Sequence, residues 1–170
     1  MKIRDITITS MLIAINVVLS YAAPIKLGNF KFTFEAFPIL VGAILYGPIC
    51  GLTVGTIGPF IYQAFSEYGL MLTTPLWILP HTLSGLIVGL YSKYHNYKMN
   101  NIQLIFITLL SSLIVTALNT LAIYCDAKIN GYYTFAYVFS NIYIKIITGI
   151  ILSIINAFII NKLMKTVSKL

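Results

Sequence analysis

The sequence predicts an all-α integral membrane protein, a single transmembrane domain over residues 1–170 with six membrane-spanning helices. Three observations predict this class. Hydrophobic residues make up 59% of the chain and charged residues only 9%, whereas a soluble domain carries about 25% charged residues. The mean hydropathy is +0.92. The apolar residues also form continuous runs, which favours helices over the alternating strands of a β-barrel.

Six apolar runs account for the predicted spans, because a helix crosses the hydrocarbon core in about 20 residues. The runs are Ile6–Ala23, Phe34–Tyr46, Gly51–Phe65, Leu70–Tyr91, Ile102–Cys125 and Tyr137–Ile160. The second and third runs are short, so we expect these helices to be tilted or partly buried inside the bundle, where the thickness of the lipid does not apply. Between the first two runs, Pro24–Thr33 predicts a structured outer loop or a short hairpin.

The basic residues predict that both ends of the chain face the cytoplasm, because lysine and arginine accumulate in cytoplasmic loops. Seven of them fall on one predicted side: Lys2, Arg4, Lys93, Lys98, Lys162, Lys165 and Lys169. The other side has Lys26, Lys31 and Lys128, together with Glu35, Glu67 and Asp126. The net charge of +7 therefore indicates topology rather than nucleic-acid binding. A cleaved signal peptide over the first run is the alternative, but its removal would leave five spans and place one terminus on the wrong side.

The chain lacks the residue patterns of catalytic and metal sites. Its two histidines, His81 and His95, are too far apart in the sequence for a metal motif and match no Ser-His-Asp set. Phosphate-binding and dinucleotide-binding glycine motifs are absent. Cys50 and Cys125 are predicted on opposite membrane faces, which forbids a disulfide. We therefore expect no enzyme; an intramembrane enzyme that uses Lys145 or His81 is the alternative.

Small residues at four-residue spacing predict close helix packing, because they let helix backbones approach each other. Two sets of glycines have the G-x-x-x-G spacing. The first is a double motif made of Gly47, Gly51 and Gly55, and the second is made of Gly85 and Gly89. We expect these glycines to pack inside the bundle. Ser10 and Ala14 form a similar pair in the first run, and periodicity alone assigns this pair to internal packing as well.

Polar side chains inside a membrane usually face a bundle interior or a cavity, because burial in lipid is costly. At about 1.5 Å of rise per residue, the amide, imidazole and ammonium groups of this chain concentrate in the outer half. We therefore predict a solute pocket open to the outside; a set of interhelical hydrogen bonds is the alternative. The predicted solute-binding residues are Asn16, Gln63, Trp77, His81, Asn119, Asn141 and Lys145. No polar stripe runs the full depth, which argues against an open channel.

Several stretches resemble the substrate-binding S components of energy-coupling factor (ECF) vitamin transporters. Ser10 and Ala14 resemble the Ala-x-x-x-Ala motif of the family's first helix. Phe34–Pro48 resembles the second helix and Gly-Pro turn of the folate-type branch, and Gly51–Gly58 resembles the glycine-rich third helix. Size, six spans and inward termini also agree, so the resemblance covers essentially the whole chain.

The resemblance implies a substrate-specific, high-affinity subunit of an ECF-type importer for a water-soluble vitamin, in the plasma membrane of a bacterium. It implies that Ser10 and Ala14 dock on an ECF module, made of a shared transmembrane coupling subunit and two ATPase subunits that use the ATP. This chain itself then needs no cofactor. An autonomous small secondary transporter or channel is the alternative, but the sequence shows no inverted repeat.

Lys145 favours an anionic solute, since it is the only lysine well inside a predicted span and a buried ammonium is costly unless paired. Asn141, one turn earlier, can share a ligand oxygen, while Trp77 and His81 would cover an apolar part. A carboxylate-bearing vitamin such as pantothenate or a folate fits, and Tyr68–Pro80 is similar to a stretch of pantothenate-type members. The alternative is that Lys145 extends to the membrane interface.

The predicted topology can be tested by cysteine labelling. In a variant that lacks Cys50 and Cys125, Phe30→Cys is expected to react with a membrane-impermeant maleimide from outside the cell. Asn96→Cys is expected to react only after the inner face is exposed, because the excess of basic residues holds that loop in the cytoplasm. The reverse labelling pattern would refute the orientation.

Overall fold

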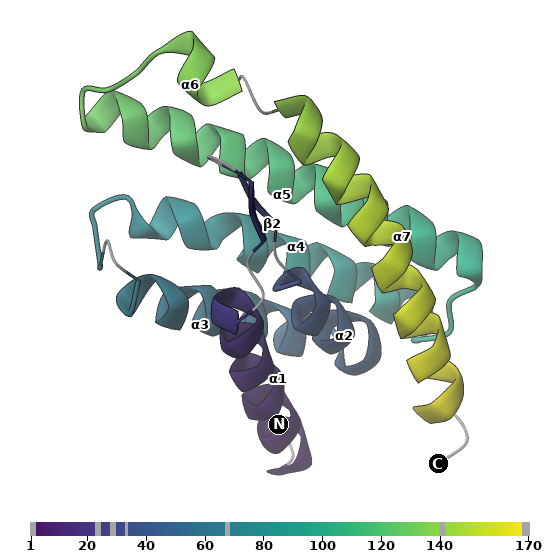
Figure 1. Cartoon of the computed structure of the whole chain (residues 1–170). Helices are drawn as coiled ribbons and strands as arrows, with labels where there is room; N and C mark the ends of the chain where they lie inside the picture. The colour runs from purple at the N-terminus through teal and green to yellow at the C-terminus, as the bar shows by residue number, and fades with distance from the viewer. Residues whose placement is uncertain are drawn as a thin grey trace.

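The computed structural model is a bundle of long helices with one short helix and a small β-hairpin (Figure 1). The structure describes residues 3–22, 25–27, 30–32, 34–66, 69–139 and 142–167. Lys2, Glu67, Asn141 and Lys169, which the sequence analysis used, lie outside these ranges. The helices are α1 (Ile3–Ala22), α2 (Ala36–Tyr46), α3 (Pro48–Ala64), α4 (Thr74–Tyr94), α5 (Asn101–Ile129), α6 (Phe135–Phe139) and α7 (Ile142–Val167).

The connection between α1 and α2 contains the predicted hairpin. Strand β1 (Ile25–Leu27) pairs antiparallel with β2 (Phe30–Phe32), and Ile25 lies opposite Phe32. The prediction of a structured loop or short hairpin is confirmed. The hairpin follows the end of α1 that lies away from the N-terminus (Figure 1).

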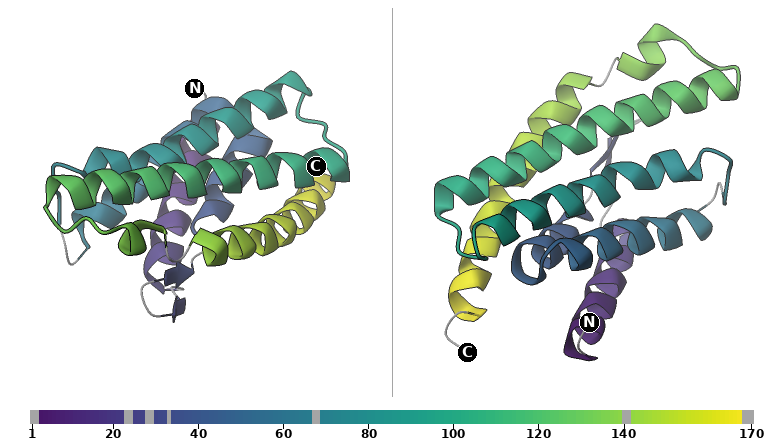
Figure 2. Two further views of the ribbon diagram at one scale, coloured as in Figure 1. Left: turned by 90° about the horizontal axis from the view of Figure 1, so that it is seen from above. Right: turned by 180° about the vertical axis from the view of Figure 1, so that it is seen from behind.

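Among the described residues, three segments are long and apolar enough to cross a membrane on their own: Ile3–Tyr21, Asn101–Ile129 and Phe135–Thr166. Helix α2 has only 11 residues, and Pro38–Ile44 within it is buried, which confirms that the second run lies inside the bundle. The start of α1 and the end of α7 lie at the same end of the molecule (Figure 2). We call this the inner end and the opposite one the outer end, after the predicted topology. Six spans with both termini inside stay a prediction.

One predicted boundary differs from the structure. The run Tyr137–Ile160 includes the end of α6, up to Phe139, and most of α7, from Ile142, and residues 140–141 lie outside the described ranges. The fifth run continues to Ile129, so Asp126 belongs to a helix and not to an outer loop. Its side chain is 8% exposed, because its carboxylate accepts hydrogen bonds from the Thr73 hydroxyl at 2.7 Å and from the Tyr132 hydroxyl.

The glycines bring α3 and α4 into backbone contact, as the G-x-x-x-G spacing predicted. A Cβ on Gly51 would lie 2.6 Å from the Gly85 carbonyl oxygen and 2.6 Å from the Ala43 Cβ. A Cβ on Gly89 would overlap the backbone of Pro48. Such distances are shorter than any real carbon contact, so a larger residue at these positions requires the helices to separate. The expectation of internal packing is confirmed for this pair of helices.

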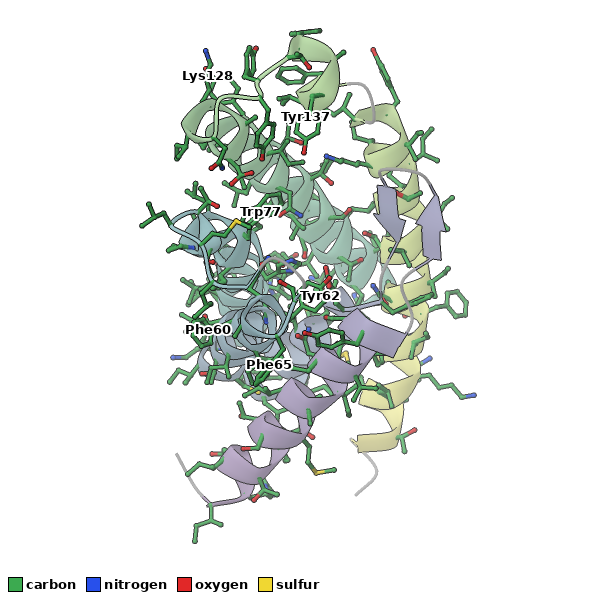
Figure 3. All side chains as sticks on the ribbon, turned by 60° about the vertical axis from the view of Figure 1, so that its left-hand side comes forward. Phe60, Tyr62, Phe65, Trp77, Lys128 and Tyr137 are labelled. Atoms are coloured by element: carbon green, nitrogen blue, oxygen red, sulfur yellow. The ribbon has the colours of Figure 1, made fainter. Side chains whose placement is uncertain are left out.

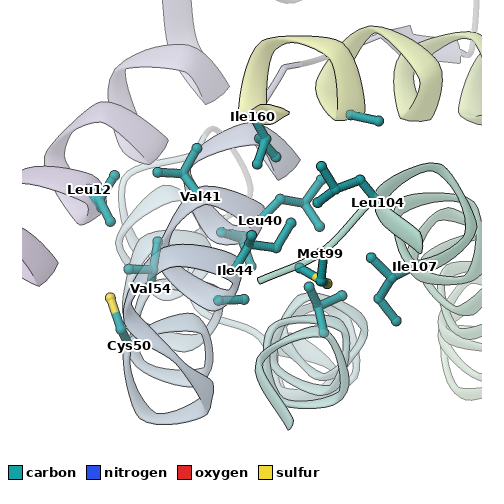
Figure 4. Close-up of a cluster of buried hydrophobic side chains, with 14 residues drawn as sticks. Leu12, Leu40, Val41, Ile44, Cys50, Val54, Met99, Leu104, Ile107 and Ile160 are labelled. Atoms are coloured by element: carbon teal, nitrogen blue, oxygen red, sulfur yellow. The ribbon is translucent and has the colours of Figure 1, made fainter. Parts of the chain in front are cut away.

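The apolar core fills the inner half of the bundle around α2 (Figure 4). Its members come from α1, α2, α3, α4, the loop before α5, α5 itself and α7, and they include Leu12, Leu40, Ile44, Val54, Val88, Met99, Leu104, Ile107 and Ile160. Most of these residues lie on the part of their helix nearer the inner end, whereas Leu40 lies near the middle of α2 and Met99 lies in the loop before α5. A few buried polar side chains, such as Thr9 and Ser92, lie in the inner half as well.

Candidate solute site and docking face

A buried polar cluster joins three elements in the outer half of the bundle. It is formed by Asn16 and Ser20 of α1, Glu35 just before α2, and His81 of α4, and we call it the Glu35 cluster. The Asn16 amide donates to the Glu35 carbonyl oxygen at 2.6 Å, and the Ser20 hydroxyl donates to the Glu35 carboxylate at 3.1 Å. The other carboxylate oxygen lies 3.6 Å from His81 Nε2. Residues far apart in the sequence are thus held around one carboxylate.

Helix α3 makes room for this cluster because it carries glycine where its neighbours approach. Asn16 is fully buried, and a Cβ on Gly58 would overlap its Oδ1 atom. One turn earlier, a Cβ on Gly55 would overlap the His81 carbonyl. The absence of side chains at these two positions therefore sets how deeply Asn16 and His81 sit in the bundle.

Two buried atoms of the cluster lack a hydrogen-bond partner among the described residues: Asn16 Oδ1 and His81 Nδ1. Leaving a buried polar atom unpaired costs about 1–3 kcal/mol, so native structures rarely do so without a reason. The Glu35 side chain is 24% exposed, which leaves the cluster open on one side. A polar molecule that enters there can supply the missing partners.

Four further predicted residues, Gln63, Trp77, Asn119 and Lys145, are half-buried. Hydroxyl contacts fix how their helices face each other: Ser84 meets Ser111 at 2.6 Å, and Ser153 donates to the Thr108 carbonyl at 3.0 Å. Trp77 and His81 lie on the same face of α4 as Ser84, and this face is directed at α5; Figure 3 shows Trp77.

Lys145 lies one turn from Gly149, and a Cβ on Gly149 would overlap the Ser112 hydroxyl of α5. Lys145 therefore lies on the same side of α7 as Gly149, one turn farther toward the outer end. No hydrogen bond among the described residues connects the side chains of Gln63, Trp77, Asn119 or Lys145 to the Glu35 cluster. The structure thus places Asn16 and His81 together and the other four on the surrounding helices. Asn141 lies outside the described residues.

The sequence analysis did not assign Glu35 and Ser20 to the site. Ser20 follows Asn16 by one helical turn, so the spacing alone puts the two on one face. Glu35 stands at the edge of an almost uncharged apolar run. An acidic residue in that position needs a partner, and this signal could have placed it with the polar residues instead of in the outer loop.

The Asp126 carboxylate ties the outer connections together. Besides Thr73 and Tyr132, it accepts a hydrogen bond from the Asn130 amide at 3.1 Å. The hydrogen bond to Asp126 raises the pKa of the Tyr132 hydroxyl above its ordinary value, so this hydroxyl stays protonated and donating at neutral pH. The loop after α3 and the loop after α5 are thereby fixed to the same point.

One face of α1 is apolar and uncovered. Ser10 and Ala14 are exposed, and around them Met11, Ile15 and Val18 are 60%, 44% and 59% exposed. The opposite face, with Leu12 and Asn16, packs on α2 and α3. The assignment of the Ser10 and Ala14 pair to internal packing is therefore wrong, because periodicity identifies a small-residue face without showing which neighbour it meets.

The six predicted solute residues that the structure describes line neither of two cavities. One, of about 460 Å³, is an apolar groove between α3 and α4 near Phe60 and Ile78. The other, of about 970 Å³, lies at the inner end. Among the described residues, no three His, Cys, Asp or Glu side chains lie close enough together to hold a metal ion.

Comparison with known proteins identifies a family. The family model described as "ECF transporter, substrate-specific component" matches residues 4–163. Curated relatives are the UPF0397 proteins of Streptococcus pneumoniae strains Hungary19A-6 and CGSP14, each 48% identical over 52 residues. That segment is 31% of this chain and 27% of each relative, so less than a third of their length is matched.

Three solved structures share the fold. A structure titled as FolT bound with folic acid has a TM-score of 0.73 at 21% identity, covering 95% of this chain and 94% of that one. The S component of a bacterial ECF transporter has a TM-score of 0.68 at 20% identity, covering 98% and 99%. An S component for biotin has a TM-score of 0.65 at 18% identity, covering 96% and 92%. At these identities the likeness establishes the fold alone.

The fit between Gly58 and Asn16 can be tested with a double-mutant cycle. Gly58→Ala is expected to lower the free energy of unfolding by about 1–3 kcal/mol, because the added methyl group overpacks against Asn16. In an Asn16→Ala background the same change is expected to have little effect, since the overlapping atom is gone. Thermal unfolding in detergent would measure both, and Ala117→Ser on the exposed face of α5 serves as a control. Equal losses in the two backgrounds would contradict this contact.

Proposed function

The chain belongs to the family of ECF transporter substrate-specific components, and from this premise we propose that it binds an anionic water-soluble vitamin in the outer half of its bundle. The protein is a membrane transport subunit, and its family consists of transporter subunits rather than enzymes. The proposed solute is pantothenate or a folate-like molecule. The chain binds this solute with high affinity and releases it during uptake.

The Glu35 cluster carries the proposal. It combines an unpaired amide oxygen, an unpaired imidazole nitrogen and a half-buried carboxylate next to one another. Asn16 Oδ1 and the Glu35 carboxylate can accept hydrogen bonds from hydroxyl or N–H groups of a solute, while the ring nitrogen can do either according to its protonation. A solute rich in hydroxyl and N–H groups can form these hydrogen bonds in place of water.

Lys145 supports the choice of an anion. Among the described residues no carboxylate forms an ion pair with its ammonium group, although the residue is half-buried on the face of α7 that continues its contacts with α5. A solute carboxylate would supply the missing negative charge. The solved structures agree with this chemistry, because the folic acid and biotin named in their titles both carry carboxylates.

Uptake needs partners in this proposal. The exposed face of α1 around Ser10 and Ala14 is the proposed docking surface for an ECF module, composed of a shared transmembrane coupling subunit and two ATPase subunits. Small residues there let a partner helix approach to backbone distance. ATP is then used by the partners, and this chain requires no cofactor. The relatives in Streptococcus pneumoniae support a bacterial plasma membrane as the location.

Replacing Lys145 tests the anionic solute. Lys145→Met is expected to weaken binding of the cognate vitamin by ten-fold or more, because a charge-assisted hydrogen bond contributes about 1.5–3 kcal/mol. Folic acid and pantothenate are the probes, and isothermal titration calorimetry of the purified subunit gives the affinities. Lys128→Met at the outer end of α5 is the matched control and should bind as the wild type does. Unchanged affinity in Lys145→Met would remove this residue from the site.

Replacing Ala14 tests the docking face. Ala14→Trp is expected to abolish uptake by cells that express the ECF module, because the indole ring holds the two helix backbones apart. Solute binding by the isolated subunit should stay intact, since the Glu35 cluster lies on the opposite face of α1. Ala117→Trp on the exposed face of α5 serves as a control for bulk at a lipid-facing position. Loss of solute binding as well would contradict a purely external role.

A further inference from the structure

A cavity with polar and apolar lining residues lies at the inner end of the bundle, away from the solute site. Its volume is about 970 Å³, and it is bounded by the end of α2, the connection between α4 and α5, and the last turns of α7. The polar groups that line it are the ammonium groups of Lys98 and Lys165 and the amides of Asn96, Asn100, Asn101 and Asn161. None of its described lining residues is acidic, so the cavity has a positive potential.

The loop before α5 is held in an unusual conformation at this cavity. Asn96 and Tyr97 have φ angles of 53° and 60°, a left-handed conformation that residues other than glycine seldom adopt twice in succession. The Tyr97 N–H donates to the Ser92 carbonyl at 2.9 Å. The Tyr97 hydroxyl would lie 2.8 Å from a Cβ on Gly47, so glycine at position 47 lets the Tyr97 ring pack against it. These contacts hold the loop in a conformation that places the side chains of Asn96 and Lys98 along the cavity.

The other half of the lining is apolar. Leu45, Met99, Ile102 and Met164 border the same space, and Ile102 is 82% exposed at the first turn of α5. Phe106, one turn along α5, is 55% exposed. The cavity thus presents ammonium and amide groups on one side and continues into an apolar helix surface on the other.

This combination matches one class of ligand. A phosphate diester is attracted by the positive charge of Lys98 and Lys165, and acyl chains attached to it can lie along Ile102 and Phe106. Basic pockets between helices on the cytoplasmic side of a membrane protein bind such headgroups. A free phosphate has no use for the apolar side, and a zwitterionic lipid carries its own positive charge. We propose that the cavity binds the headgroup of an anionic phospholipid from the inner leaflet.

The proposal does not depend on the identity of the solute, and it can be tested on the full-length purified protein. Dioleoylphosphatidylglycerol and dioleoylphosphatidylcholine are the two probes, titrated in detergent and counted as retained molecules by native mass spectrometry. Retention of phosphatidylglycerol over phosphatidylcholine is expected. Removing one lysine, by Lys98→Gln or Lys165→Gln, should weaken its binding about five-fold, and removing both about thirty-fold.

The matched control is the double variant Lys93→Gln/Lys162→Gln. Both residues are exposed and lie on the inner-end segments of α4 and α7, but neither lines the cavity. This control should retain phosphatidylglycerol as the wild type does. An equal loss in the control would show a diffuse surface charge effect and overturn the proposal.

Two further results would also overturn it. Inorganic phosphate that displaces phosphatidylglycerol at millimolar concentration, with no contribution from the acyl chains, would mean a site for free anions. Unchanged lipid retention in Lys98→Gln/Lys165→Gln, combined with lost assembly with the ECF module, would assign the surface to a protein partner. Thermal unfolding of each variant in phosphatidylcholine alone checks that the exposed substitutions leave the fold intact.

Discussion

The close approach of α3 to its neighbours is the contact on which the rest of this structure depends. Gly51 and Gly85 bring the backbones of α3 and α4 together, and this fixes the height of His81 relative to Gly55. Gly58 then admits Asn16 from α1. Because no side chain fills these gaps, each position is set by backbone atoms, which cannot rotate out of the way. The polar groups proposed to bind the solute therefore reach their positions because the glycines of α3 leave room for them.

The position of the apolar core in the inner half and of the Glu35 cluster in the outer half follows from the same arrangement. Helix α2 is short and buried, and it fills the inner half with branched side chains packed against five other helices. In the outer half its place is taken by Glu35 and the connection that leads to it. A carboxylate at this point gathers polar groups from α1 and α4, so the end of one short helix determines where the site begins.

Composition and periodicity were sufficient for much of this architecture. The continuous apolar runs predicted the helices, the glycine spacing predicted the α3–α4 contact, and the polar segment after α1 predicted a hairpin. The internal assignment of Ser10 and Ala14 was wrong, because a small-residue face has the same spacing whether it meets its own chain or a partner. Glu35 was not predicted in the site, because the depth of a residue was counted along its own span. Such a count does not show that the residue before α2 lies against α1 and α4.

The two pairs of neighbouring helices are joined by different chemistry. Between α3 and α4, glycines bring backbone atoms into contact beside the hydroxyl pair Thr56–Thr82. Helix α5 meets α4 through Ser84–Ser111, and it meets α7 through Thr108–Ser153 and the approach of Gly149 to Ser112. Interhelical hydrogen bonds of this kind contribute only about 0.6 kcal/mol on average, and a hydroxyl can exchange one carbonyl for the next along a helix. A slide of α3 along α4 would press side chains against the backbone at Gly51 and Gly85, so that contact admits a single register. Lys145 belongs to α7, on the side joined by hydroxyl groups, whereas Glu35 is held by α1 and α4.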